Sequence, residues 1–213
     1  MKIEVNEIHP RVVLLKFESQ YEIASTMMML QEYYESPYEN IFRKIVSYEE
    51  YMDTYAKDTG NFTYFSDWSG FNVPGNIIME YRNKHAHSDI LYLKKEKLLF
   101  EILSRYIEKY GDNFYVIAIY KETDIKHEQA HAFYYLHKEY KKEINKIINK
   151  RLKYFKDKKK KLLKIGYRID MVDDEQQAYF IETKLSNEST RLIGLQKKAI
   201  KLFNRYTKVR RKK

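Results

Sequence analysis

One strand separates two parts of this chain that differ in their sequence patterns. The run FYVIAIY at 114–120 is short, aliphatic and aromatic, and polar turn residues flank it, which is typical of a buried strand. Before this run the sequence alternates between strand-like and helix-like segments, whereas every segment from residue 124 onward has a helical pattern. Mixed strands and helices followed by helices alone predict an α+β fold, with a small mixed or antiparallel sheet in the N-terminal half and a mainly helical C-terminal half.

Local signals place several elements of the first half. RVVLLKF at 11–17 predicts a strand. Ser47 begins a capping box and predicts a helix start, and Gly60 predicts the end of that helix. The aromatic stretch at 61–81 predicts short strands joined by a tight loop at SGFNVPG (69–75), and the segment 91–110 predicts a long amphipathic helix.

The composition narrows the kind of protein. The 213 residues include no cysteine, so disulfides are excluded and any metal site must use histidine and carboxylate ligands. Hydrophobic residues make up 44% of the chain, which is enough for a folded core. The longest apolar runs, such as Met27–Leu30, are too short to span a bilayer, and MKIEVNEIHP carries charges where a signal peptide needs an apolar stretch. These features predict a cytoplasmic protein with no membrane partner.

The segment DIKHEQAHAFYYL at 124–136 contains the pattern His-Glu-X-X-His. On a helix, His127 and His131 lie one turn apart on the same face, so both imidazole rings can reach one zinc ion. Glu128 projects about 100° further round the helix, where it reaches a water beside the metal and is poorly placed to bind the metal itself. This arrangement suits a glutamate that takes a proton from that water. The plainer interpretation is a pair of surface or core histidines on an ordinary helix.

The order of strand, His-Glu-X-X-His helix and later acidic helix resembles the zincin metallopeptidases. In their gluzincin branch the third ligand is a glutamate on a later helix, and DDEQQAYF at 173–180 resembles that element, with Glu175 in the ligand position. The resemblance covers 114–183 and implies one zinc ion per chain, held by His127, His131 and Glu175. It also implies that Glu128 is the catalytic base.

His137 is the rival of Glu175 for the third ligand. It lies ten residues after His127, which is the spacing of the metzincin pattern, but that pattern needs glycine where this chain has Tyr134. The glycine turns the chain sharply out of the helix, and a bulky residue disfavours that turn. AFYYLHKEY shows no break, and on a continuing helix His137 would face about 240° away from His131. The sequence therefore favours Glu175 and leaves both alternatives open.

Further predictions concern the surroundings of the metal. Asp124 and Asp174 are candidates to accept a hydrogen bond from the second ring nitrogen of a ligating histidine, although Asp124 also suits a helix cap. Tyr179 is a candidate to stabilise an oxyanion, and Tyr134 and Tyr135 are alternatives for that role. By resemblance to zincins, an edge strand before the active-site helix, either 114–120 or one near 62–66, would pair with the substrate backbone. The alternative is that both are core strands.

The chain shows no internal repeat and no flexible linker. We therefore predict a single zincin-like metallopeptidase domain over 1–213. It comprises a mixed α/β half (1–123), the two metal-site helices (124–189) and a C-terminal basic helix and tail (190–213). Breaks in the helical half are expected near 154–158, at 166–170 and at 186–189.

Together these features predict a zinc-dependent metallopeptidase that hydrolyses a peptide or protein substrate. The net charge of +10 supports an alternative, because its excess lies in KDKKKK at 156–161 and KVRRKK at 208–213. Such runs can bind nucleic acid, although a solvated helix face and tail explain them as well. The alternative function is a basic nucleic-acid-binding or DNA-associated protein with a structural or latent metal site.

Overall fold

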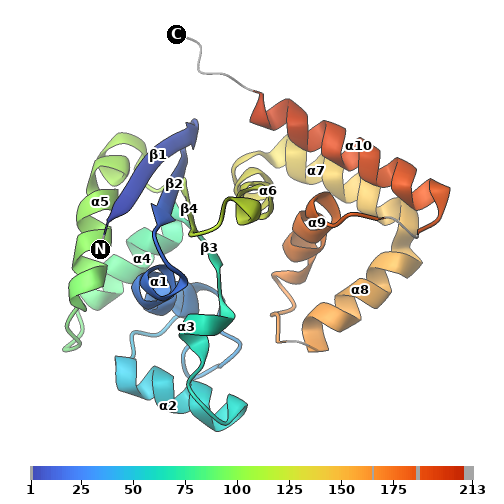
Figure 1. Cartoon of the computed structure of the whole chain (residues 1–213). Coiled ribbons are helices and arrows are strands. Elements are labelled where there is room, and N and C mark those ends of the chain that lie inside the picture. Colours follow the sequence, from blue (N-terminus) through green and yellow to red (C-terminus); the bar gives the residue numbers. More distant parts are fainter. Residues whose placement is uncertain (1, 165, 186–187, 209–213) are drawn as a thin grey trace. The chain divides into compact units, whose positions relative to one another are not determined.

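The computed structural model describes residues 2–164, 166–185 and 188–208 (Figure 1). The chain divides into two compact units, Met1–Asp124 and Ile125–Lys213. This boundary lies beside the predicted change from mixed to helical structure after residue 123. The α+β class is confirmed, because the described part of the first unit contains a small mixed sheet and the second unit is helical.

The first unit combines four described strands with helices. Its elements in chain order are β1 (Ile3–His9), β2 (Val12–Phe17), α1 (Gln20–Glu35), α2 (Tyr48–Thr59), α3 (Tyr64–Asp67), β3 (Gly70–Pro74), α4 (Gly75–His85), α5 (Lys94–Tyr110), β4 (Tyr115–Ile119) and the short 3-10 turn η1 (Glu122–Asp124). The strand order is β1-β2-β4-β3, with β2 and β4 parallel and the other two pairs antiparallel. The sheet is therefore mixed.

Strand β4 lies inside the sheet, so the prediction of an edge strand before the metal-site helix is wrong. Its backbone pairs with β2 on one side and with β3 on the other. All five of its residues are buried, which is typical of a strand covered on both faces. An aliphatic run without polar alternation indicates such an interior strand, whereas the edge position was implied only by the resemblance to zincins.

The stretch 61–81 also differs from its prediction. The predicted loop holds the strand β3, and the flanking segments form the helices α3 and α4. Phe71 and Val73 are buried and pair in register with β4, so sheet pairing overrides the turn-forming glycines and proline nearby. The aromatic residues before β3 pack as a cluster of rings, with Tyr64 edge-on to Tyr51 and Tyr55 of α2. Neither candidate edge strand is therefore an edge strand in this fold.

The helix-end predictions in the first unit are confirmed. The Ser47 hydroxyl accepts a hydrogen bond from the Glu50 backbone N–H, and Ser19 caps α1 in the same way. Gly60 ends α2 with a φ of 87°, a conformation that costs glycine little. Gly111 follows the last residue of α5. The signals of Ser47 and Gly60 predicted the ends of α2 correctly because capping depends on a few neighbouring residues.

The second unit is built from helices. They are α6 (Ile125–Leu136), α7 (Lys138–Ile148), a 3-10 turn η2 (Asn149–Arg151), α8 (Leu152–Lys164), α9 (Val172–Glu182) and α10 (Thr190–Thr207). Helix α6 packs against α9, and α7 lies beside α10 (Figure 1). Buried apolar residues from these helices form the core between them, including Ala132, Phe133, Ile144, Ala178, Ile181, Leu202 and Phe203.

Two predicted features of this half are wrong. Helix α8 runs through 154–158, where a break was expected, because Phe155 and Leu162 share a buried face that continues across it. The helix that was expected to continue past His137 instead ends at Leu136, and His137 has an extended backbone. The break at 166–170 is confirmed, and residues 186 and 187 of the last expected break lie outside the described residues. Within the described residues, no helix combines the length and the apolar character that crossing a membrane requires.

Candidate metal centre

Helices α6 and α9 bring the candidate metal ligands of the second unit together. The two helices pack against each other, and the small residues Ala130 and Ala132 of α6 and Ala178 of α9 are fully buried. The Lys126 ammonium group donates to the Ile181 carbonyl oxygen at 2.7 Å and ties the start of α6 to the end of α9. This close packing places side chains of both helices within reach of one ion.

His127, His131 and Glu175 converge on one point. One potential ligand atom from each of the three lies within 4.8 Å of the others. The two Nε2 atoms are 3.1 Å apart, Glu175 Oε1 is 3.5 Å from His131 Nε2, and Glu175 Oε2 is 3.7 Å from His127 Nε2. Ligands held about 2.0–2.1 Å from a tetrahedral ion lie about 3.3 Å from one another, so the separations fit an ion of that kind.

Two further carboxylates hold the opposite nitrogens of the histidine rings. Glu182 Oε2 lies 3.0 Å from His127 Nδ1, and Asp174 Oδ1 lies 3.0 Å from His131 Nδ1. Carboxylates only accept hydrogen bonds, so each Nδ1 carries a hydrogen, and in the neutral form each ring would turn an Nε2 lone pair toward the other ring. Carboxylates in this position also orient histidines that bind metals.

Asp174 is itself fixed by a neighbouring amide. The Gln177 side chain donates to Asp174 Oδ1 at 2.9 Å, and the Tyr140 hydroxyl donates to the oxygen of the same Gln177 side chain. Gln177 and Tyr140 are completely buried. The hydrogen-bonded chain therefore extends from His131 into the core of the unit, which holds the ring in one orientation.

The site is short of hydrogen-bond donors and rich in negative charge. Glu175 is 5% exposed, and its Oε2 has no hydrogen-bond partner within the part of the chain that the structure describes. Two lone pairs and a carboxylate that face one another are unfavourable unless a cation lies among them. The cluster can therefore hold a metal ion, and its nitrogen and oxygen donors are those that zinc accepts.

The carboxylates also change the protonation of the histidines in the metal-free protein. Burial lowers the pKa of His127, but the nearby Glu175 carboxylate, the hydrogen bond to Glu182 and the charge of Glu128 outweigh it and raise the pKa to about 11. Burial likewise lowers the pKa of His131, but the charges of Asp174 and Glu175 raise it to about 9. The hydrogen bond to His127 lowers the pKa of Glu182. Without a metal the cluster attracts protons, which are the simplest cations able to neutralise it.

The remaining predicted residues fall into different surroundings. Glu128 is 6% exposed and lies in the first turn of α6, beside His127. The Tyr179 ring packs edge-on against the His127 ring at 4.7 Å, and its hydroxyl lies 3.2 Å from the Tyr167 hydroxyl. His137 packs against the rings of Phe133 and Tyr206, where it begins α7. The structure thus brings together Glu175 and the two motif histidines and places His137 in an aromatic contact.

One residue of the cluster was not predicted, and one predicted partner lies elsewhere. Glu182 lies seven residues after Glu175, which places both on one face of α9 two turns apart, and this spacing could have identified it. Asp124 accepts a hydrogen bond from the neighbouring Thr123 hydroxyl, so the structure supports Asp174 as the partner of a ring nitrogen.

Comparisons with protein-family models, with curated proteins and with solved structures gave no significant match to this chain.

Proposed function

We propose that this protein is a zinc-dependent metallopeptidase. The observation that carries the proposal is the convergence of His127 Nε2, His131 Nε2 and the Glu175 carboxylate, with each Nδ1 held by another carboxylate. Three protein ligands leave one tetrahedral position for water or substrate, as in catalytic zinc sites, whereas structural sites close all four. The absence of cysteine also disfavours the thiolate ligands that structural zinc sites prefer.

Each residue then has a distinct role. Zinc supplies Lewis acidity, which lowers the pKa of water and polarises a peptide carbonyl group. Glu128 accepts the proton from the attacking water and passes it to the leaving nitrogen, because it follows His127 and projects to one side of the ligand pair. Asp174 and Glu182 orient the two rings, and Tyr179, whose ring packs against His127, is a candidate to donate a hydrogen bond to the developing oxyanion.

The first expected result concerns metal content. Protein reconstituted with zinc and freed of excess metal should retain about one zinc ion per chain, because one cluster of this kind is present in the described residues. Elemental analysis by mass spectrometry measures the content and identifies the metal. His131→Ala should retain almost none, while His87→Ala, which removes an exposed histidine outside the cluster, should match the wild type. A wild-type protein without zinc after reconstitution would refute the proposal.

The second expected result concerns the carboxylate behind His131. Asp174→Ala should lower zinc affinity about 10- to 100-fold, because the ring loses the group that fixes its orientation and raises its basicity. Competition with a fluorescent chelator measures the affinity. Asp173→Ala is the matched control, since Asp173 is the adjacent carboxylate but pairs with Lys159. Equal affinities in the two variants would show that Asp174 has no part in the site.

A further inference from the structure

Charge is distributed very unevenly between the two units. Residues 125–213 contain 26 lysines and arginines and 10 aspartates and glutamates, a formal charge of +16. Residues 1–124 contain 14 basic and 20 acidic residues, a formal charge of −6. The whole positive excess of the protein therefore belongs to the helical unit. Part of the negative charge of this unit lies in the acidic residues around the candidate metal centre.

Helix α10 carries this charge on one face. Its opposite face is buried in the core of the unit and is apolar, with Leu192, Leu195, Ala199, Leu202 and Phe203. Its outer face exposes basic side chains, and no acidic residue occurs between Thr190 and Lys208. The exposed basic residues are Arg191, Lys197, Lys198, Lys201, Arg205 and Lys208.

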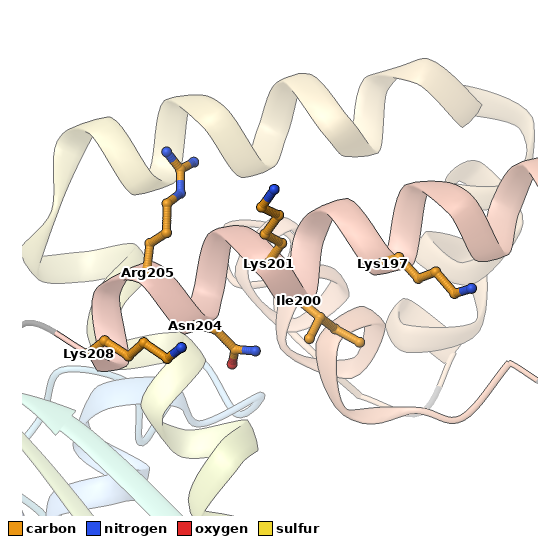
Figure 2. A pocket seen from close by; sticks show the side chains of 6 residues that line it. All are labelled: Lys197, Ile200, Lys201, Asn204, Arg205 and Lys208. Atoms are coloured by element: carbon orange, nitrogen blue, oxygen red, sulfur yellow. The ribbon is translucent and has the colours of Figure 1, made fainter.

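Four of these basic residues line a pocket of about 450 Å³ (Figure 2). Lys197, Lys201, Arg205 and Lys208 project from successive turns of α10, and Ile200 and Asn204 complete the lining. At 1.5 Å per residue the four basic residues form a row about 16 Å long. Like charges one turn apart repel each other, so this row is unfavourable until an anion lies along it.

The neighbouring helix extends the positive surface. Helix α7 lies beside α10 and exposes Lys141, Lys142 and Lys146. Among the described residues, α10 forms one ion pair, between Arg205 and Glu143 at 2.8 Å. The other basic side chains of the row therefore remain available to an external anion.

We propose that the outer face of α10, extended by α7, binds the phosphate backbone of a nucleic acid. A row of phosphates is the extended anion that matches a row of lysines and arginines. A membrane surface fits less well, because an interfacial helix needs exposed apolar side chains, and the large apolar side chain that α10 turns to the pocket, Ile200, is only partly exposed. Within the described residues, none of the exposed large hydrophobic side chains belongs to α10. This inference is independent of the proposed peptidase activity.

The test is the salt dependence of binding to a 20-base-pair DNA duplex, measured by fluorescence anisotropy with the full chain. If four phosphates are neutralised, affinity should fall about 150-fold between 50 and 200 mM salt. Lys197→Ala combined with Lys201→Ala should reduce this loss to about 12-fold, because two phosphate contacts disappear. Lys160→Ala combined with Lys161→Ala, which removes the same charge from exposed positions on α8, should leave the salt dependence unchanged.

Three results would overturn the inference. The first is the absence of salt-dependent binding to the duplex. The second is an equal loss of affinity between 50 and 200 mM salt in both double variants, and the third is tighter binding to vesicles of phosphatidylcholine and phosphatidylserine than to the duplex. An equal loss would mean that net charge alone attracts the duplex, and tighter vesicle binding would identify a membrane surface as the partner. Zinc content, measured on the same variants, should be unchanged, so that a failure of this inference is distinguishable from a failure of the metal site.

Discussion

Glu128→Gln should bind zinc as the wild type does and hydrolyse peptides at least 10²- to 10⁴-fold more slowly, the range that a positioned general base contributes. Glutamine has nearly the same size as glutamate, so the variant preserves the packing around a side chain that is only 6% exposed. An amide cannot accept the proton of the attacking water at neutral pH. The measurement is the hydrolysis rate of a pool of quenched fluorescent peptides, with zinc content determined on the same sample.

A matched control separates the loss of the base from a general loss of charge. Glu139→Gln removes an exposed carboxylate from α7, outside the cluster, and should keep the wild-type rate. A Glu128→Gln protein that carries zinc and still hydrolyses peptides at the wild-type rate would exclude Glu128 as the base. A wild-type protein that carries zinc and hydrolyses no peptide of the pool would favour the alternative of a structural or latent metal site.

The candidate site was predictable because its information is local. The i,i+4 spacing of His127 and His131 fixes their common face on any helix, whatever the rest of the fold does. Glu175 depends on the packing of α9 against α6, which spacing alone does not determine, and only a family resemblance singled it out in advance. Glu182 follows from Glu175 by helical periodicity, but that inference requires the role of Glu175 to be known first.

The sheet was harder to predict because its information is not local. The partners of β4 come from residues 12–16 and 70–74, and nothing within 115–119 states which strand lies on which side. Strand β1 was not predicted, although its polar and apolar residues alternate as they do in a half-buried strand. The charges of this segment were interpreted only as evidence against a signal peptide. Strand β3 was assigned to a loop because Gly70, Pro74 and Gly75 are strong turn formers in isolation.

Removal of the metal should destabilise the protein strongly. A ligand that binds only the folded state adds about 2.7 kcal/mol to the free energy of unfolding at 100 times its dissociation constant, and about 4.1 kcal/mol at 1,000 times. The zinc-loaded protein should therefore unfold at a higher urea concentration than the chelator-treated protein. His131→Ala should show no such difference, because a ligand is missing, and a zinc-dependent shift in this variant would place the bound ion elsewhere.

The size of this stabilisation should depend on pH in a defined direction. In the metal-free protein the pKa values of His127 and His131 are raised to about 11 and about 9, above the value of about 6.5 in an unfolded chain. Their protonated forms thus stabilise the metal-free fold fully below about pH 6.5, and this contribution is lost as the pH rises through about 9 and then 11.

Zinc needs the same nitrogens without protons, so its affinity should weaken as the pH falls and protons compete. The loss of the protonated forms and the tighter binding of zinc both increase the stabilisation by zinc as the pH rises. The difference in unfolding free energy between the zinc-loaded and metal-free proteins should accordingly be small at pH 6 and grow toward pH 9. Urea titrations at pH 6, 7.5 and 9, at one buffered free zinc concentration, measure it. A difference that stays constant or shrinks over this range would mean that zinc does not displace protons from His127 and His131, and the metal would then have to bind through other groups.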